Sequence, residues 1–216
     1  MKRKAVLFDL DGTILDTLGD LSNSVNFALQ ENNLPPRSID EVRSFVGNGI
    51  RLLIERAVPE GTDTCVVDKC FNDFKKHYKD NSAILTKPYD GVIELVKILR
   101  GKGYKTAVVS NKADFAVQSL VEQYFEGLFD FAVGEKEGVR RKPSPDSVYS
   151  VLKDMNINPD ESIYIGDSEV DVETSRNAGV ECVCVTWGFR DRELLEKEKP
   201  DYIADSISEI LEIIGE

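Results

Sequence analysis

The sequence of 216 residues contains one histidine and four cysteines. The single histidine, His77, argues against any mechanism that needs a catalytic histidine together with further histidine ligands. It lies in a polar helical stretch and is expected at the surface. The cysteines lack the C-x-x-C spacing of zinc and redox motifs, so we expect reduced, mostly buried thiols; they are Cys65, Cys70, Cys182 and Cys184.

Long apolar runs and a positive net charge are missing as well. No run approaches the ~18 residues of a membrane span, and the first residues lead into a short strand instead of a secretion signal. The 27 Lys and Arg against 39 Asp and Glu give a net charge of −12. Such a chain repels nucleic acids and anionic membranes. The sequence therefore predicts a cytoplasmic protein, although a local basic pocket can still bind a small anion.

What is present is the composition of a globular protein, with 41% hydrophobic and 31% charged residues. The length predicts one large domain, or a core with a small insert. Residues 5–9 form a short apolar run that predicts a buried strand. Residues 17–78 instead show helical periodicity, beginning with a stripe that runs from Leu18 to Leu29. This stretch predicts an all-helical insert of roughly 70 residues.

After the insert, strands and helices alternate. We expect helices at 92–99, 115–124, 147–153, 171–178 and 207–214, and strands at 105–110, 131–133, 163–165, 182–185 and 202–203. Near-continuous apolar strands that alternate with helices are typical of a parallel sheet covered on both faces. The chain is therefore expected to have an α/β fold.

Polar residues collect where the predicted strands end, which is where ligands bind in such sheets. Four carboxylates should meet there: Asp9, Asp11, Asp167 and Asp171. Like charges at one edge are stable when a cation neutralises them, and oxygen ligands without histidine or cysteine favour Mg²⁺.

Groups suited to a phosphate accompany these acids at the same edge. They are Thr13, Ser110, Asn111 and Lys142, whose donors match the non-bridging oxygens. A carboxylate, Mg²⁺ and a phosphate together suggest attack on phosphorus to form an aspartyl phosphate. A second carboxylate can protonate the leaving alcohol and later activate water.

Four ordered motifs resemble those of the haloacid dehalogenase superfamily phosphatases. They are Asp9-x-Asp11-Gly-Thr13, Ser110-Asn111, Lys142-Pro-x-Pro-Asp146 and Gly166-Asp167-Ser168-x-x-Asp171. The resemblance implies a Rossmann-like parallel core from residues 1–15 and 86–216, with an inserted helical cap at 16–85. It implies Asp9 as nucleophile, Asp11 as acid/base, and Mg²⁺ held by Asp9, the Asp11 carbonyl and Asp167 with support from Asp171. Ser110 and Lys142 would hold the phosphoryl group.

Within this superfamily, three stretches resemble the phosphoglycolate phosphatase branch: residues 45–57, 110–112 and 186–203. The resemblance implies a magnesium-dependent hydrolase of a small phosphorylated metabolite, with 2-phosphoglycolate the best single guess and a monomer or homodimer as the assembly. Pyrophosphatases, nucleotide and sugar-phosphate phosphatases and phosphomutases share much of these stretches. In the cap, the glycines of Gly47-Asn48-Gly49 are candidates for close approach to substrate, because glycine permits positive φ.

Other interpretations stay open at this point. Thr13 and Ser110 are also typical of turn or helix caps, and Asp171 of a helix first turn. Arg51 could meet a substrate anion or lie at the surface. A receiver-like signalling module also carries an acidic phospho-acceptor site, but it has no use for a helical insert after the first strand.

Overall fold

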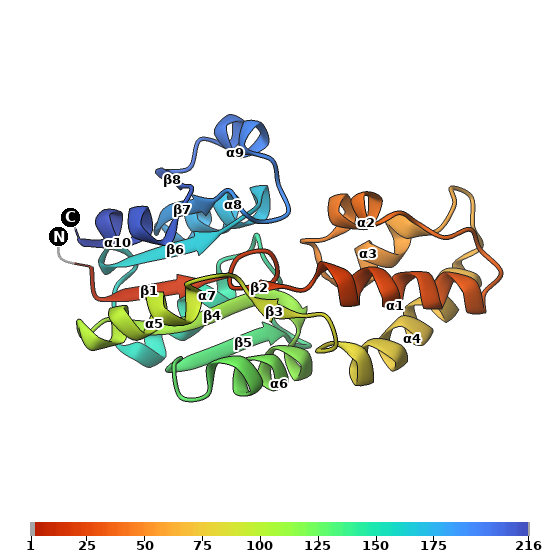
Figure 1. Cartoon of the computed structure of the whole chain (residues 1–216), viewed down its shortest axis with the longest axis horizontal. Coiled ribbons are helices and arrows are strands. Elements are labelled where there is room, and N and C mark those ends of the chain that lie inside the picture. The colour runs from red at the N-terminus through yellow and green to blue at the C-terminus, as the bar shows by residue number, and fades with distance from the viewer. Residues whose placement is uncertain (1–2, 216) are drawn as a thin grey trace. The chain divides into compact units, whose positions relative to one another are not determined.

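The computed structural model describes residues 3–215, which divide into two compact units (Figure 1). One unit, called the core below, takes in the first 15 residues and those from Pro88 onward. The other, called the cap, is Asp16–Lys87. The chain passes from the core into the cap at β2 (Leu15–Asp16) and returns to the core at β3 (Lys87–Pro88). These two strands pair in a small two-stranded sheet.

The core is built on a six-stranded sheet in the order β5-β4-β1-β6-β7-β8, and every pairing in it is parallel. The strands are β1 (Ala5–Phe8), β4 (Lys105–Ala113), β5 (Phe131–Glu135), β6 (Ser162–Gly166), β7 (Glu181–Val185) and β8 (Tyr202–Ala204). The core helices are α5 (Val92–Gly101), α6 (Asp114–Phe125), α7 (Asp146–Met155), α8 (Glu169–Ala178), α9 (Arg192–Glu198) and α10 (Ile207–Gly215), with a 3₁₀ turn at Pro159–Glu161.

The register of β1 explains why the site forms where it does. Ala5 lies opposite both Lys105 of β4 and Ser162 of β6, so the three strands run side by side and end at one edge. All four residues of β1 are buried. One face of the sheet packs against α7, and Figure 1 shows α5 across the near face. A strand buried on both faces needs apolar residues throughout, which is the pattern of residues 5–8.

The cap consists of four helices, α1 (Leu18–Glu31), α2 (Ile39–Phe45), α3 (Gly49–Ala57) and α4 (Thr64–Asn81). Its interior is formed by fully buried side chains from each helix, including Val25, Leu29, Val42, Ile54 and Phe74. The Asp20 carboxylate joins the two ends of the unit, because it accepts hydrogen bonds from the amides of Ile84, Leu85 and Thr86 and from the Thr86 hydroxyl.

The α/β class and the helical insert predicted from the sequence are confirmed. The helices α2 and α9 escaped the prediction, because in each seven-residue segment one side chain is buried and no apolar stripe develops. The strand β4 runs past its predicted end at Ser110 to Ala113, with an irregular register after Val109.

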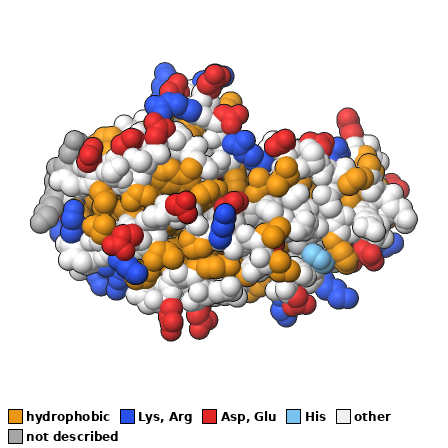
Figure 2. All heavy atoms as spheres, viewed as in Figure 1, with side chains coloured by type: hydrophobic (Ala, Val, Ile, Leu, Met, Phe, Trp, Pro, Cys, Tyr) orange, Lys and Arg blue, Asp and Glu red, His pale blue; other side chains and the backbone are white. Residues whose placement is uncertain are grey.

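The thiols follow the expected distribution, whereas the single histidine departs from it. Figure 2 shows acidic and basic side chains interspersed over the visible face. Cys65 is exposed and the other three cysteines are buried thiols. His77 is more enclosed than expected: it is half-buried, hydrogen-bonded to Ser24 and stacked on Phe27. In the described part of the chain, no helix has the length and apolar character needed to cross a membrane.

Candidate active site

Asp9 stands at the centre of the site, directly after β1. Its amide donates to the carbonyl of Ile165 on β6 (2.9 Å), which continues the sheet by one residue and fixes the start of the loop. The side chain is buried, with 8% of the residue exposed. Carboxylate oxygens of Asp9, Asp167 and Asp171 lie within 4.8 Å of one another. The structure thus brings three of the four predicted carboxylates into one cluster.

Lys142 reaches this cluster from the loop that follows β5. Its Nζ lies 3.0 Å from Oδ1 of Asp9 and 2.8 Å from Oδ1 of Asp171, and it donates to the Tyr164 hydroxyl at 2.9 Å. The Tyr164 hydroxyl in turn donates to the carbonyl of Val109 (2.8 Å). Burial alone would lower the pKa of Lys142, but the neighbouring carboxylates outweigh it and raise that pKa well above its usual value. Lys142 is therefore a fixed positive charge beside Asp9.

Asp171 is fully buried and has several donors. Its Oδ2 accepts from the amides of Asp167 and Ser168 (3.1 Å each) and from the Ser168 hydroxyl (2.7 Å). These contacts form the capping box that begins α8. Asp171 thus has both of its predicted features: it lies in the carboxylate cluster, and it is an acid in the first turn of a helix.

Asp167 follows β6 and is held by donors from two other loops. Its Oδ1 accepts from the Thr13 hydroxyl (3.1 Å), and its Oδ2 accepts from the amide of Phe189 (2.7 Å). Thr13 is 1% exposed. The structure therefore directs the Thr13 hydroxyl, a predicted phosphate ligand, at Asp167. Gly12 has φ +83°, and a Cβ there would overlap the Asp167 carboxylate, so only glycine fits at this position.

Asp11 is paired with Lys112, a residue at the end of β4. Lys112 Nζ donates to Oδ1 of Asp11 at 2.7 Å, and the side chain of Lys112 is 2% exposed. Lys112 is two residues beyond Ser110, whose Oγ accepts from the Lys112 amide (3.3 Å). The carboxylate of Asp11 thus has a defined orientation at the edge of the sheet, set by a residue about a hundred positions later in the chain.

Asn111 makes a reciprocal pair with the backbone of Lys142. Its Nδ2 donates to the Lys142 carbonyl (3.0 Å), and its Oδ1 accepts from the Lys142 amide (2.8 Å). Both ends of the predicted phosphate-binding amide therefore engage the loop that carries the lysine. Asn111 positions Lys142, while Ser110, 7% exposed, precedes Asn111 within β4.

The electrostatics of the cluster are those of a site built for a cation. Burial is the main cause that raises the pKa of Asp9 from 3.8 to about 6; Lys142 opposes this, and Asp171 and Asp11 reinforce it. Burial, followed by Asp171 and Asp9, raises the pKa of Asp167 well above its usual value. In the described structure, Oδ1 of Asp9 accepts no well-aligned hydrogen bond, despite its ion pair with Lys142. A divalent cation would supply the missing partner, so the residues fit Mg²⁺.

The residues predicted for the cap belong to a separate unit. Gly47 and Gly49 have φ of +124° and +81°, so both use backbone conformations that favour glycine. Arg51 lies on α3, where its guanidinium pairs with Glu55 (2.6 Å) and Asp68 (2.5 Å). Its charge is balanced within the cap, which agrees with the surface interpretation of this residue.

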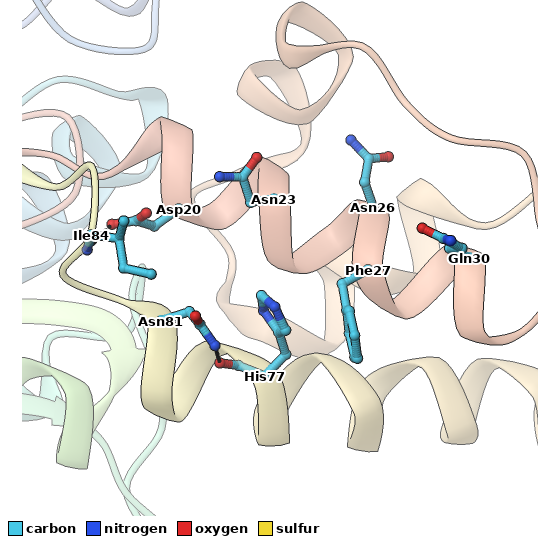
Figure 3. Close-up of a pocket in the computed structure, with 8 residues that line it drawn as sticks. All are labelled: Asp20, Asn23, Asn26, Phe27, Gln30, His77, Asn81 and Ile84. Atoms are coloured by element: carbon cyan, nitrogen blue, oxygen red, sulfur yellow. Dashed lines mark hydrogen bonds between the residues drawn. The ribbon is translucent and has the colours of Figure 1, made fainter.

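A pocket of about 400 Å³ lies within the cap, between α1 and α4 (Figure 3). Figure 3 shows the rings of Phe27 and His77 side by side across it, with centroids 4.2 Å apart. The remaining lining consists of Asp20, Asn23, Asn26, Gln30, Asn81 and Ile84. The Asp20 carboxylate is occupied by its backbone donors, and the lining carries no basic side chain other than the histidine, so this pocket is not suited to a phosphate.

Sequence reasoning missed several residues that shape this site. Tyr164, inside a buried strand, anchors Lys142; Lys112 holds Asp11; the amide of Phe189 holds Asp167. For Tyr164 and Lys112, a polar side chain at a buried or strand-end position was the available signal. For Phe189 there was no such signal, because a backbone amide has the same chemistry in every residue.

Comparison with known proteins places the chain in a family. The model of the haloacid dehalogenase-like hydrolases matches residues 6–185. A phosphoglycolate phosphatase of Pseudomonas putida is 32% identical over 96% of this chain and 78% of its own length, and one of Aquifex aeolicus is 30% identical over 98% and 96%. A crystal structure of a candidate phosphoglycolate phosphatase from Lactobacillus delbrueckii superposes with a TM-score of 0.93 at 38% identity, covering 99% of both chains. The chain belongs to the haloacid dehalogenase-like hydrolases.

Proposed function

We propose that this protein is a Mg²⁺-dependent phosphatase that hydrolyses a small phosphomonoester through an aspartyl phosphate on Asp9. The family and the named relatives indicate a phosphoric monoester hydrolase. The observation that carries the mechanism is the state of Asp9. It is a buried carboxylate whose Oδ1 accepts no well-aligned hydrogen bond, 3.0 Å from an ammonium that can draw in a phosphoryl group.

In the first half-reaction, a carboxylate oxygen of Asp9 attacks phosphorus. The O–P bond to the alcohol breaks as the bond to Asp9 forms, so the phosphoryl group is transferred to the enzyme. Lys142 lies where it can neutralise a non-bridging oxygen, and the Tyr164 hydroxyl keeps its ammonium in place. A preorganised charge of this kind stabilises the transition state without reorganising during the reaction.

Asp11 acts as the acid in the first half-reaction and as the base in the second. Its carboxyl group would donate a proton to the departing alkoxide and then accept one from the water that hydrolyses the aspartyl phosphate. Both steps need the same side chain to stay beside the reacting atoms. The contact with Lys112, 2.7 Å from Oδ1, fixes one oxygen of that carboxylate.

The charge balance supports the cation. When Asp9, Asp11, Asp167 and Asp171 are all ionised, they exceed the two ammonium groups of Lys112 and Lys142 by two negative charges before a phosphate arrives. Asp9, Asp167 and the Asp11 carbonyl would hold Mg²⁺, with Asp171 beside them. When bound, the ion neutralises this excess and polarises the phosphoryl oxygens.

For the substrate, we propose 2-phosphoglycolate, which is supported by the names of the relatives. The core residues recognise the phosphoryl group that all monoesters share. The choice of substrate therefore falls to other residues, for which Gly47 and Gly49 of the cap are the proposed candidates. We further propose that the enzyme acts in the cytoplasm as a monomer or homodimer.

A panel of phosphate esters, assayed by phosphate release with purified protein and Mg²⁺, tests this function. It should include 2-phosphoglycolate, pyrophosphate, nucleoside monophosphates and sugar phosphates. We expect 2-phosphoglycolate to give the highest kcat/KM, without a bisphosphate activator. No phosphate release from any ester would contradict the proposed hydrolase, and a requirement for a bisphosphate would identify a mutase instead.

A further inference from the structure

We infer that the segment after β7, Thr186–Phe189, is the support that orients Asp167 toward the divalent cation, with Gly188 and Trp187 as positioning residues. The inference rests on the proposed function, because it assumes that Asp167 is a metal ligand. The sequence Trp187-Gly188-Phe189 follows the last of the four motifs and carries no titratable side chain. Its role would be to hold Asp167 in place.

The Asp167 carboxylate is held at both oxygens by different parts of the chain. The amide of Phe189 donates to Oδ2 at 2.7 Å, while the hydroxyl of Thr13 donates to Oδ1 at 3.1 Å. The two donors come from loops that are more than 170 residues apart in the sequence. Since each oxygen has its own donor, the carboxylate cannot rotate without losing a hydrogen bond.

Gly188 provides the space for this arrangement. A Cβ at this position would overlap the Cβ of Asp167 and lie 2.5 Å from both Oδ2 of Asp167 and the carbonyl oxygen of Gly12. Gly188 has no positive φ, so its backbone conformation is open to any residue. Glycine is needed here for close approach alone, and any larger residue must push the segment or Asp167 aside.

Trp187 ties the segment to the loop that begins at Asp9. Its indole Nε1 donates to the carbonyl of Thr13 at 3.1 Å, so the residue that holds Oδ1 is itself held from the segment. Trp187 is half-buried, and its ring lies 6.4 Å from that of Tyr89. These contacts form one connected network. Trp187 holds Thr13, and Thr13 and Phe189 hold Asp167. The absence of a side chain at Gly188 lets the segment approach Asp167 closely.

Groups that orient metal ligands affect affinity almost as the ligands do, with losses of about 10–100-fold when they are removed. We therefore expect Gly188→Ala to weaken Mg²⁺ binding about tenfold or more, measured by isothermal titration calorimetry with Mg²⁺ alone and no substrate. Gly101→Ala is the matched control, because Gly101 has no neighbour within 4 Å and no positive φ. It should bind Mg²⁺ as the unchanged protein does.

A second variant keeps the inference testable if Gly188→Ala fails to fold. Trp187→Phe removes the indole donor but keeps an aromatic ring, and we expect a loss of Mg²⁺ affinity of about three- to tenfold in a protein that still folds, with a melting temperature lower by a few degrees. Wild-type Mg²⁺ affinity in either folded variant would overturn the inference. Failure of the proposed function is a separate result: the unchanged protein would bind Mg²⁺ but release no phosphate from any ester.

Discussion

The core and the cap organise their polar residues in opposite ways. In the core, Asp9, Asp167 and Lys142 are buried and connected to neighbours on several strands. In the cap, Arg51 forms exposed ion pairs, and the pocket between α1 and α4 is lined mainly by uncharged groups. An exposed ion pair contributes ~1 kcal/mol or less to the free energy of unfolding. A buried charge is costly unless neighbouring groups pair with it, so its surroundings must supply charges and hydrogen bonds in fixed positions.

This difference indicates that the core carries out the proposed chemistry at phosphorus and that the cap selects the substrate. Chemistry at phosphorus needs charges that are fixed before substrate arrives, and a buried, hydrogen-bonded cluster provides them. Selection among esters needs a surface that can vary without disturbing that cluster. Substitutions in the core should therefore affect all substrates alike, while substitutions in the cap should separate one substrate from another.

The largest effect is expected for Asp9→Asn. An amide cannot attack phosphorus, so kcat should fall by at least ~10⁴-fold for every ester tested. Steady-state phosphate release is the measurement, and Asp154→Asn, an exposed change on α7, is the control. Activity of the Asp9→Asn protein within tenfold of the unchanged enzyme would remove Asp9 from the mechanism.

The second prediction concerns metal and pH in the core. Because the folded protein raises the pKa of Asp9 from 3.8 to about 6, Asp9 of the metal-free protein stays largely neutral up to about pH 6 and is ionised above it. The associated stability is present below about pH 4 and is lost as the pH rises through about 6. Mg²⁺ needs the ionised form, so its stabilising effect should increase over the same range.

Calorimetric melting in EDTA and in saturating Mg²⁺ checks this prediction. At pH 7.5, Mg²⁺ at about 100 times its Kd should raise Tm by about 5–10 °C, and at pH 4.5 by much less. The difference in Tm between EDTA and Mg²⁺ at one pH cancels the titration of acids that do not contact the ion. An equal Mg²⁺ effect at both pH values would mean that the ion binds away from the buried carboxylates.

The smallest and most selective effect is expected in the cap. Gly49→Ala introduces a side chain at φ +81° in the Gly-Asn-Gly turn, and we expect kcat/KM for the preferred ester to fall about tenfold. Hydrolysis of p-nitrophenyl phosphate should change less than about twofold, since its leaving group needs little recognition. Gly61→Ala is the control, because Gly61 has the same φ in another turn of the cap. Parallel losses on both substrates would assign this turn a structural role only.

In the core, the sequence predicted the positions of the main site residues but not their partners. Asp9, Asp11 and Asp167, which follow the ends of β1 and β6, were predictable, because parallel strands bring their carboxyl ends to one edge. The partners of those residues were not. Lys112 beside Asp11 and the Phe189 amide on Asp167 depend on contacts between segments far apart in the chain.

The cap was predictable as a helical unit but not in detail. The apolar stripe of α1 was long enough to recognise, whereas α2 buries only Val42 and is defined by its start. Ser38 and Glu41 form a capping box there, a local signal that fits many short segments. The role of Gly47 and Gly49 stays a prediction, because a glycine turn in the sequence indicates conformational freedom and not what approaches it.

Trapping the covalent intermediate tests the central claim most directly. In Asp11→Asn, the base that activates water for dephosphorylation is lost, so incubation with Mg²⁺ and p-nitrophenyl phosphate, whose leaving group needs no proton from Asp11, should accumulate phosphorylated enzyme. Peptide mass spectrometry after an acid quench should locate the phosphoryl group on Asp9, and the Asp9→Asn protein should carry none. A phosphoryl group on another residue, or turnover of the unchanged enzyme with no labelled Asp9 in either protein, would contradict the account.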